Sequence, residues 1–250
     1  VAGGIPILRT ITDSLQANNI TRVMGIINGT TNYILTSMDE DGKSFEEALS
    51  EAQVLGYAEA DPTADVEAYD AMYKLSILSS MAFHAHMPID VIYREGITKL
   101  SKADFETAKQ LGYRIKLLAI GQKEGNRISV RVHPAMLPMV HPLANVRGAF
   151  NAVFLTGHAV GDIMLYGRGA GMLPTASAVV SDVVYASHAE GKHRYMTFQN
   201  MAGMSSEVEL ISDFLCIYCI RVRVVDRPGT MAAIAAAFAR HNVSLKSVLQ

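Results

Sequence analysis

The sequence predicts an α+β fold, in which a mixed or antiparallel sheet is covered by helices on one face and is followed by half of a small βαβ module. Mostly helical patterns fill residues 6–111, and strand patterns dominate residues 113–166. Helices first and strands later favour an α+β layer over an alternating parallel sheet. A Glu-Gly-Asn triplet at 124–126 links two of the strand patterns, as in a hairpin.

The N-terminal half is expected to be mainly helical around one buried strand. Pro6 opens an amphipathic stretch, Ser44 and Glu47 form a capping box, and Pro88 marks the end of a long helix. The expected helices cover 6–16, a stretch that begins near Asn32, 44–56, 65–86 and 101–111, and the expected strand covers 21–27.

The second half is expected to contain most of the sheet and a separate C-terminal segment. A polar stretch at 188–206 reads as a linker, so a first domain at 1–205 precedes a partial second domain at 217–250. The first domain should contribute strands at 113–122, 127–134, 149–157 and 160–166 and a helix at 174–189; the second should contribute a strand at 219–225, a turn at 226–229, a helix at 230–240 and the start of a strand at 243–249.

Composition excludes several classes of protein. Half of the residues are hydrophobic and 18% are charged, which suits a globular chain with a core. The net charge of -2 gives no electrostatic reason to expect nucleic acid or an anionic membrane as a partner. No apolar run approaches the roughly 20 residues that span a bilayer. The start lacks the pattern of a signal peptide, so we expect a cytoplasmic protein, with Val1 an interior residue of a longer gene product.

The two cysteines, Cys216 and Cys219, form a C-x-x-C spacing. The chain has no second such pair and no nearby His pair that could complete a zinc site, and its eight histidines show no metal-ligand spacing. Buried free thiols are therefore the expected state.

An acidic loop at 56–65, followed by Asp70 and Lys74, is the densest cluster of chemistry-bearing residues. Lys74 lies in an otherwise apolar helical pattern, so its charge must be neutralised, paired or directed into a polar cavity. Asp70 lies one turn earlier, which leaves an ordinary intrahelical ion pair as one explanation. Glu59 and Asp65 bring two more acids to the start of this helix. The set suits a ligand with its own ammonium group, with Lys74 exchanging a proton with a substrate oxygen.

A second candidate site is the strand-to-helix turn Asn28-Gly29-Thr30-Thr31. Free N–H groups and the positive end of the helix dipole at such a turn suit an anion, for example a substrate carboxylate. A tight turn with Thr or Asn caps explains the same residues without a ligand. Asp61 before Pro62 likewise has an ordinary explanation as a helix cap.

A third candidate is the glycine-rich loop at 167–171. It follows a strand pattern and precedes a helix, but Met172 occupies the place of the last glycine in a dinucleotide fingerprint. No second strand with an acidic residue follows about 20 positions later, as a dinucleotide-binding fold requires. We therefore reject such a domain here, while the glycines still permit backbone contact with a cofactor bound mainly elsewhere.

Taken together, three motifs resemble the homoserine dehydrogenase family, which interconverts aspartate 4-semialdehyde and homoserine with NAD or NADP. The resemblance covers about residues 1–205. The motifs are Gly-Thr-Thr-Asn-Tyr-Ile at 29–34, Gly-Tyr-x-Glu-x-Asp-Pro at 56–62 with Asp65, Asp70 and Lys74, and Gly-Arg-Gly-Ala-Gly-x-x-Pro-Thr at 167–175.

The resemblance implies roles for particular residues. Lys74 is then the catalytic lysine, which donates a proton to the developing alkoxide during reduction. Substrate binding is assigned to Glu59, Asp65, Asp70, Gly29 and Thr30, cofactor contact to Gly171, and a monovalent cation (Na⁺ or K⁺) to the carbonyl groups of Val1, Gly3 and Ile5. An acidic residue that precedes this cation loop in the family is not in the chain.

The C-terminal segment, with Asp226-Arg227-Pro228-Gly229, resembles the first half of an ACT domain, a ferredoxin-like fold. ACT domains bind amino acids and often pair, so the resemblance implies threonine as an effector of the full-length protein. A homodimer or higher homo-oligomer is also expected, since the strand-rich region could pair across a two-fold axis.

Two functions follow as alternatives. The first is the substrate-binding part of a homoserine dehydrogenase, with homoserine or aspartate 4-semialdehyde as substrate and no activity in the isolated fragment, because the family's nucleotide-binding domain and its glycine fingerprint are upstream. The second is a regulatory or dimerisation module that binds an amino acid through residues 217–250; it leaves the acids around Lys74 unexplained.

Overall fold

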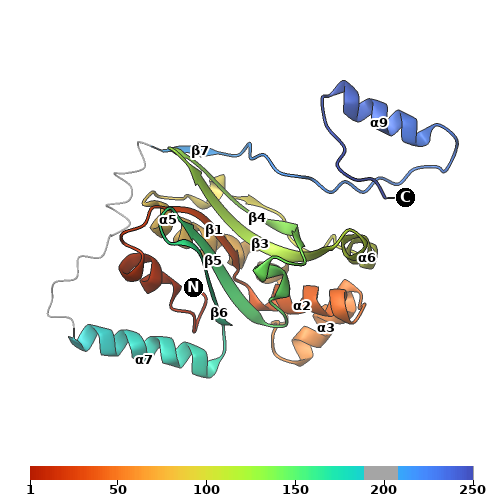
Figure 1. Ribbon diagram of the computed structural model, residues 1–250. Coiled ribbons are helices and arrows are strands. Elements are labelled where there is room, and N and C mark those ends of the chain that lie inside the picture. Colours follow the sequence, from red (N-terminus) through yellow and green to blue (C-terminus); the bar gives the residue numbers. More distant parts are fainter. Residues whose placement is uncertain (189–207, 250) are drawn as a thin grey trace. The chain divides into compact units, whose positions relative to one another are not determined.

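The computed structural model describes residues 1–188 and 208–249, which divide into two compact units, Val1–Phe214 and Leu215–Gln250. In the described residues of the first unit, seven strands form one sheet in the order β2-β4-β3-β1-β5-β6, with β7 also paired to β4 (Figure 1). Pairing is antiparallel except where β2 and β7 join β4 in parallel. The predicted mixed sheet is therefore confirmed. The strands are β1 (Ile20–Ile26), β2 (Tyr93–Arg94), β3 (Tyr113–Glu124), β4 (Arg127–Pro138), β5 (Phe150–Gly157), β6 (Gly161–Arg168) and β7 (Glu209–Ile211).

Helices α2, α5 and α6 pack on one face of this sheet. Alternate strand residues such as Val23 and Leu117 share a core with Leu75 and Phe83 of α5, whereas Met24 and its neighbours on the other face share a smaller core with the turn η3. The helical elements are α1 (Ile7–Arg9), η1 (Thr10–Ser14), α2 (Gly29–Glu40), α3 (Phe45–Val54), α4 (Thr63–Val66), α5 (Tyr69–Phe83), η2 (Ile89–Val91), α6 (Lys102–Gln110), η3 (Pro142–Asn145), α7 (Met172–His188) and, in the second unit, α9 (Thr230–Arg240).

Several helix ends follow the local sequence signals. The predicted capping box of Ser44 and Glu47 is present at the start of α3, and Gly56 adopts a positive φ just after that helix, where glycine is favoured. A second capping box, of Ser101 and Asp104, starts α6. These ends are set by neighbours in the chain, which is why the sequence predicts them.

Two helix boundaries differ from the prediction. Helix α2 begins at Gly29 and not near Asn32, because the Asn28 side chain accepts the N–H of Thr31 and so caps the helix earlier. The long helix expected over 65–86 is split into α4 and α5 by Ala68, which is buried with φ of 63°. The break turns the chain between Asp65 and Asp70.

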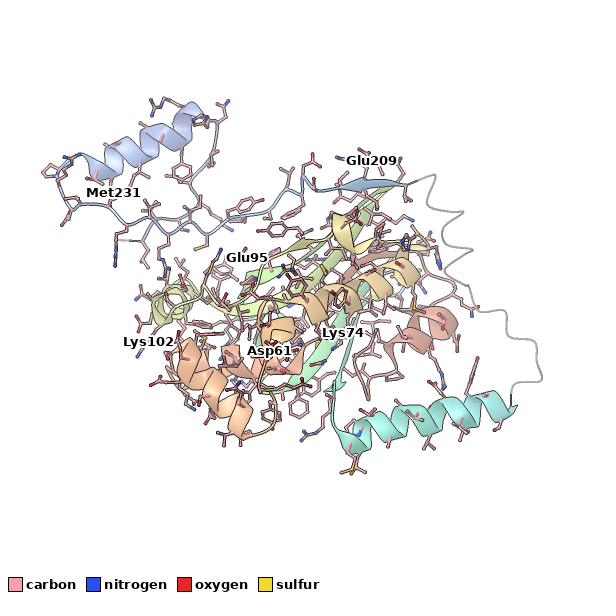
Figure 2. The ribbon with its side chains drawn as sticks, turned by 180° about the vertical axis from the view of Figure 1, so that it is seen from behind. Asp61, Lys74, Glu95, Lys102, Glu209 and Met231 are labelled. Atoms are coloured by element: carbon pink, nitrogen blue, oxygen red, sulfur yellow. The ribbon has the colours of Figure 1, made fainter. Side chains whose placement is uncertain are left out.

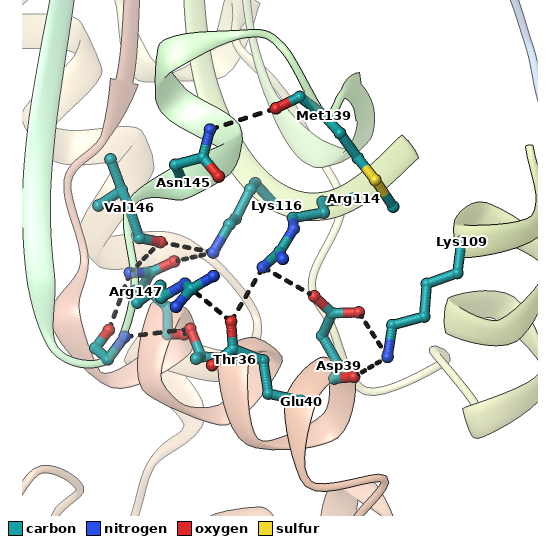
Figure 3. A network of polar contacts seen from close by, with 12 residues as sticks. Thr36, Asp39, Glu40, Lys109, Arg114, Lys116, Met139, Asn145, Val146 and Arg147 are labelled. Carbon is teal, nitrogen blue, oxygen red and sulfur yellow. Dashed lines mark hydrogen bonds and ion pairs between the residues drawn. The ribbon is translucent and has the colours of Figure 1, made fainter. Parts of the chain in front are cut away.

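A buried polar network attaches α2 to the sheet (Figure 3). Lys116 of β3 is only 3% exposed, and its Nζ donates to the Val146 carbonyl at 2.6 Å and to Oδ1 of Asn32 at 3.1 Å. Asn32 in turn donates to the carbonyl groups of Val146, Gly148 and Phe150. Burial lowers the pKa of Lys116 to about 8. The first turns of α2 are thus fixed to β3 and to the start of β5.

Cations surround the opposite end of α2. Lys109 and Arg114 both pair with Asp39, and Arg114 and Arg147 both lie 2.9 Å from Glu40 (Figure 3). Positive charge at a helix C-terminus complements the helix dipole. With both ends held, α2 has a defined position from which to present its N-terminus.

The second unit contains α9, as predicted, but the strands expected at 219–225 and 243–249 are absent from its described residues. A strand needs a hydrogen-bonded partner, and residues 219–225 and 243–249 pair with no other strand among the described residues. Cys216 and Cys219 are free, as expected, but exposed and not buried. The predicted linker lies almost entirely outside the described residues.

Candidate functional site

The site centres on Lys74, near the middle of α5. Its Nζ donates to Oδ2 of Asp70 at 2.6 Å and to the carbonyl oxygen of Ile27, just after β1, at 3.2 Å. The side chains of Lys74 and Asp70 are 26% and 31% exposed. Figure 2, seen from behind the view of Figure 1, labels Lys74 on this helix. The ion pair that the sequence left open is therefore formed, and the lysine also reaches the end of β1.

Asn28 joins this pair to a second acid. Its Nδ2 donates to Oδ1 of Asp65 at 2.6 Å and to Oδ2 of Asp70 at 2.9 Å, while its Oδ1 accepts from the N–H of Thr31 at 2.8 Å. One amide thus holds two carboxylates from α4 and α5 next to each other and caps α2. Without these donors, two adjacent carboxylates would repel each other.

The cluster retains capacity for a ligand. An ammonium has three donors, and Lys74 uses two of them. Within the described residues, Asn28 and Lys74 engage one oxygen of each carboxylate, and the second oxygen of Asp65 and of Asp70 accepts no hydrogen bond. Two carboxylates and one ammonium leave a net charge of -1. The arrangement can therefore bind a cationic group while offering an N–H to a neutral or anionic oxygen.

The N-terminus of α2 lies directly beside this cluster. The first intrahelical hydrogen bond runs from the N–H of Asn32 to the carbonyl of Asn28, so the N–H groups of Gly29 and Thr30 precede the helical ladder. Thr30 Oγ1 donates to the Tyr57 carbonyl at 2.6 Å. A Cβ on Gly29 would lie 2.9 Å from the Ala149 carbonyl oxygen, which explains the glycine. The helix end is packed closely against β5 and retains its N–H groups for an anion.

Two acids of the predicted loop lie outside the hydrogen-bonded cluster. Glu59 is exposed, and its backbone carbonyl accepts from Gln53 at 3.1 Å. Asp61 accepts from the N–H and hydroxyl of Thr63, and these bonds lower its pKa. Asp61 therefore forms a local turn with Thr63, while the residue that caps α4 is Pro62 and not Asp61 as the sequence suggested. Glu59 makes no side-chain hydrogen bond to the cluster within the described residues.

The glycine-rich loop after β6 packs on the first residues of the chain. The N–H of Gly4 donates to the Arg168 carbonyl at 3.1 Å, and Gly3, with φ of 47°, faces the Gly169 backbone so closely that any Cβ would overlap the carbonyl oxygen. Gly171 has φ of 116°, which favours glycine at the start of α7. The two loops assigned by resemblance to the cation and the cofactor are thus in direct contact.

The carbonyl groups of the N-terminal loop differ in whether they accept a hydrogen bond. That of Ile5 accepts from the N–H of Ile7 at 2.7 Å, while those of Val1 and Gly3 accept no hydrogen bond within the described residues. No group of three or more His, Cys, Asp or Glu side chains in the described residues could hold a metal ion. A cation here would depend on carbonyl oxygens.

Asn151 of β5 was missed by the sequence reasoning, as was Asn28. The Asn151 side chain is 1% exposed and lies against the backbone of Gly169, and its Oδ1 has no hydrogen-bond partner in the described residues. For Asn28, the sequence had already suggested an Asn cap at this turn, and what it missed is the contact of the amide with Asp65 and Asp70. Asn151 carries no local signal, because its surroundings come from strands and loops distant in sequence.

The candidate site is open to solvent. Two surface hollows of about 250 and 300 Å³ lie elsewhere, one between α2 and α6 and one beside β4 and β7, and neither contains a predicted site residue. In the described residues no helix is long and apolar enough to cross a membrane.

Comparison with protein families gives two matches. The family model of homoserine dehydrogenase matches residues 6–184, and the model of the ACT domain matches residues 219–250. The first match contains α2, α4 and α5, which carry the acid–lysine cluster. The second contains α9.

Known proteins give the same result. The homoserine dehydrogenase of Mycobacterium tuberculosis (strain ATCC 25618 / H37Rv) is 47% identical over 100% of this chain and 58% of its own length. The structure of a homoserine dehydrogenase from Thiobacillus denitrificans superposes with a TM-score of 0.85 at 42% identity, over 100% of this chain and 59% of that one. A hyperthermophilic archaeal homoserine dehydrogenase mutant in complex with NADPH gives a TM-score of 0.63 at 32% identity, over 75% and 53%. Although these first two matches cover the whole of this chain, the chain spans somewhat under three fifths of the length of each relative.

Proposed function

Because this chain belongs to the homoserine dehydrogenase family, we propose that it supplies the substrate-binding part of an enzyme that reduces L-aspartate 4-semialdehyde to L-homoserine. The observation that carries this proposal is the environment of Lys74, whose ammonium is held by Asp70 and the Ile27 carbonyl with one N–H left for a substrate oxygen. A substrate that is an amino acid with a reducible carbonyl matches each feature of the site.

Different residues bind different groups of the substrate. The free carboxylate oxygens of Asp65 and Asp70 bind the substrate ammonium, and Glu59 joins them from its loop. The N–H groups of Gly29 and Thr30 bind the substrate carboxylate at the positive end of α2. Lys74 donates a proton to the carbonyl oxygen as it becomes an alkoxide, and takes that proton back in the reverse direction.

The cofactor is NADP or NAD, which supplies or accepts the hydride when bound. Its fit to this chain is supported by the loop at 167–171, where Gly171 is exposed, and by the unpaired amide oxygen of Asn151 beside that loop. Gly171 would contact the nicotinamide end. Most other contacts are expected outside these 250 residues, so the isolated chain is expected to be inactive.

A monovalent cation is proposed at the N-terminal loop. The unengaged carbonyl groups of Val1 and Gly3, with that of Ile5 as a third ligand, support a Na⁺ or K⁺ site. The test is the affinity for homoserine or cofactor in sodium, potassium and a bulky organic cation at equal ionic strength. No difference between the three salts would remove the cation from the proposal.

The direct test of function uses the longest gene product that carries this chain. Homoserine-dependent reduction of NADP⁺ or NAD⁺, followed at 340 nm, should occur in the wild type and be lost in Lys74→Ala. Threonine, serine and glycerol as substrates test whether the amino-acid group and the chain length are both needed. Equal turnover of glycerol would contradict the assigned ammonium and carboxylate sites.

The match of residues 219–250 to the ACT family favours an additional regulatory role. We propose that in the full-length cytoplasmic enzyme this segment takes part in binding threonine as an effector, and that the chain assembles as a homodimer or higher homo-oligomer. Inhibition by threonine that disappears when residues 217–250 are deleted supports the first point. Sedimentation at micromolar concentration tests the second.

A further inference from the structure

Asn151 is a buried polar side chain to which the proposed reaction has not yet assigned a bonding partner. It is 99% buried by surface area, being 1% exposed, and its Oδ1 has no hydrogen-bond partner within the described residues. Buried amide groups in folded proteins are almost always hydrogen-bonded. Leaving one unpaired is unfavourable enough that a partner outside this chain is the natural explanation.

The position of the amide tells where that partner lies. A Cβ added to Gly169 would overlap the Asn151 amide, and one added to Gly29 would lie 3.7 Å from its Oδ1. Both neighbouring residues are glycines, so backbone and not side chain borders the amide on these two sides. One of them begins α2, the proposed carboxylate site, and the other belongs to the proposed cofactor loop.

β-Sheet geometry directs the side chain toward the site. Asn151 pairs with Gly167 across β5 and β6, and its neighbour Ala152 pairs with Ile26. Ala152 belongs to the smaller core on the far face, whereas Val153 belongs to the core shared with α5. Because side chains alternate along a strand, Asn151 lies on the same face as α2 and α5.

We propose that Asn151 is a ligand-binding residue, whose amide oxygen accepts a hydrogen bond from an N–H donor at the junction of the substrate and cofactor sites. Two groups of the proposed reaction offer such a donor: the ammonium of the amino-acid substrate and the carboxamide of the nicotinamide ring. This inference rests on the proposed function and adds to it a residue that determines how the two ligands are placed relative to each other.

The decisive variant is Asn151→Leu, which keeps the branched shape and removes the polar atoms. A ligand-binding amide predicts that the ligand-free protein is as heat-stable as the wild type or more so, because an unpaired buried group has been removed. It also predicts that one ligand binds about tenfold more weakly. A purely structural amide predicts the reverse pattern, namely lower heat stability with unchanged affinity.

Two binding measurements identify the donor. Homoserine alone is titrated by calorimetry, and NADPH alone by the quenching of its fluorescence, with the longest gene product that carries this chain. Weaker homoserine binding assigns the ammonium, and weaker NADPH binding assigns the carboxamide. Asn151→Asp, which keeps an acceptor and adds a charge, should retain or increase the affinity for homoserine if the donor is the ammonium.

The controls separate this inference from the proposed function. If the wild type binds neither homoserine nor NADPH, the proposed function fails and the inference with it. If the wild type binds both and Asn151→Leu binds both equally well, the role of Asn151 is overturned while the proposed function stands. Asn126→Leu, in the exposed hairpin turn after β3, is the matched control and should change neither affinity.

Discussion

The Nζ of Lys74 lies 2.6 Å from Oδ2 of Asp70, one turn earlier on α5. On a helix surface this i,i+4 pair would be worth only a few tenths of a kcal/mol. Here the lysine also donates to a carbonyl at the end of β1, so the pair fixes the direction of the ammonium. We take orientation of the proposed proton donor, and not stability, as the purpose of this ion pair.

Replacing Lys74 tests that interpretation. Lys74→Ala should lower kcat by about 10²- to 10⁴-fold, the usual contribution of a positioned acid or base, while circular dichroism and the unfolding midpoint change little, since alanine favours helices. Asp70→Asn, which keeps a hydrogen-bond acceptor, should lower kcat less than Lys74→Ala. A Lys74→Ala enzyme with near-normal turnover would remove the lysine from the mechanism.

Asn28 should affect both stability and substrate affinity. Asn28→Ala removes a helix cap, at a cost of about 1 kcal/mol, and also the donors that Asp65 and Asp70 share. Asn28→Asp keeps the cap acceptor but places a third carboxylate beside two others, which raises its pKa in the folded state. Its destabilisation should therefore be smallest at low pH, where the new carboxyl is protonated, and should grow as the pH rises.

Urea unfolding of the two Asn28 variants between pH 4 and pH 8 gives the comparison. The deficit of Asn28→Ala relative to wild type should depend on pH far less than that of Asn28→Asp. Parallel curves for both variants would mean that the two carboxylates are not close in solution.

Lys116 predicts a particular pH dependence of stability. Burial lowers its folded-state pKa to about 8, against an ordinary value of 10.5. Between these values the unfolded state binds more protons than the folded state, so the free energy of unfolding rises with pH. At about 1.4 kcal/mol per pH unit, the contribution of this group increases by about 2 kcal/mol from pH 8 to pH 9.5.

Lys116→Met provides the reference, because it removes the titrating group and retains much of the volume. The difference in unfolding free energy between wild type and Lys116→Met should shift in favour of the wild type as the pH rises above 8, and should be flat below it. A difference that stays constant from pH 7 to pH 9.5 would show that the ammonium is not desolvated.

The contact between Gly3 and Gly169 can be tested against a matched glycine. Gly3 and Gly125 have similar positive φ values, 47° and 62°, but a Cβ on Gly3 would overlap the Gly169 carbonyl, while one on Gly125 meets nothing within 4 Å. Gly125→Ala should cost only the conformational strain of about 1 kcal/mol. Gly3→Ala should in addition detach the N-terminal loop.

Hydrogen exchange at the N–H of Gly4, which donates to the Arg168 carbonyl, reports this detachment. Its protection should be lost in Gly3→Ala and kept in Gly125→Ala. Equal protection in both variants would mean that the two loops are not in contact.

The accuracy of the sequence-based predictions followed the range of the interactions involved. The capping box of Ser44 and Glu47 and the hairpin at 124–126 depend on adjacent residues and were predicted. The cap of α2 by Asn28 is also local, but the contacts of the same amide with Asp65 and Asp70 join residues about 40 positions apart and were not predicted. Ala68, between α4 and α5, has a left-handed backbone conformation and is buried in the core. The residues next to it in the sequence give no signal that predicts this conformation.

The candidate site shows the same dependence on distance. Asp70 and Lys74 are one turn apart, so their pairing was foreseeable. Asp65 and Asp70 come together because the chain turns at Ala68 and because the Asn28 amide donates a hydrogen bond to each carboxylate. Asn151 became a candidate only when its surroundings were known. The strands expected in the second unit did not form for a related reason. A segment with a β pattern becomes a strand only when a second strand hydrogen-bonds to it.

The packing of Gly3 against Gly169, and of Gly4 against Arg168, has a thermodynamic consequence. One loop carries the proposed cation ligands and the other contacts the proposed cofactor, and neither can shift without displacing the other. Ordering of one loop by its ligand lowers the entropic cost of ordering the other. Sodium or potassium and the nicotinamide cofactor would then be linked ligands, each changing the affinity of the other by the same factor.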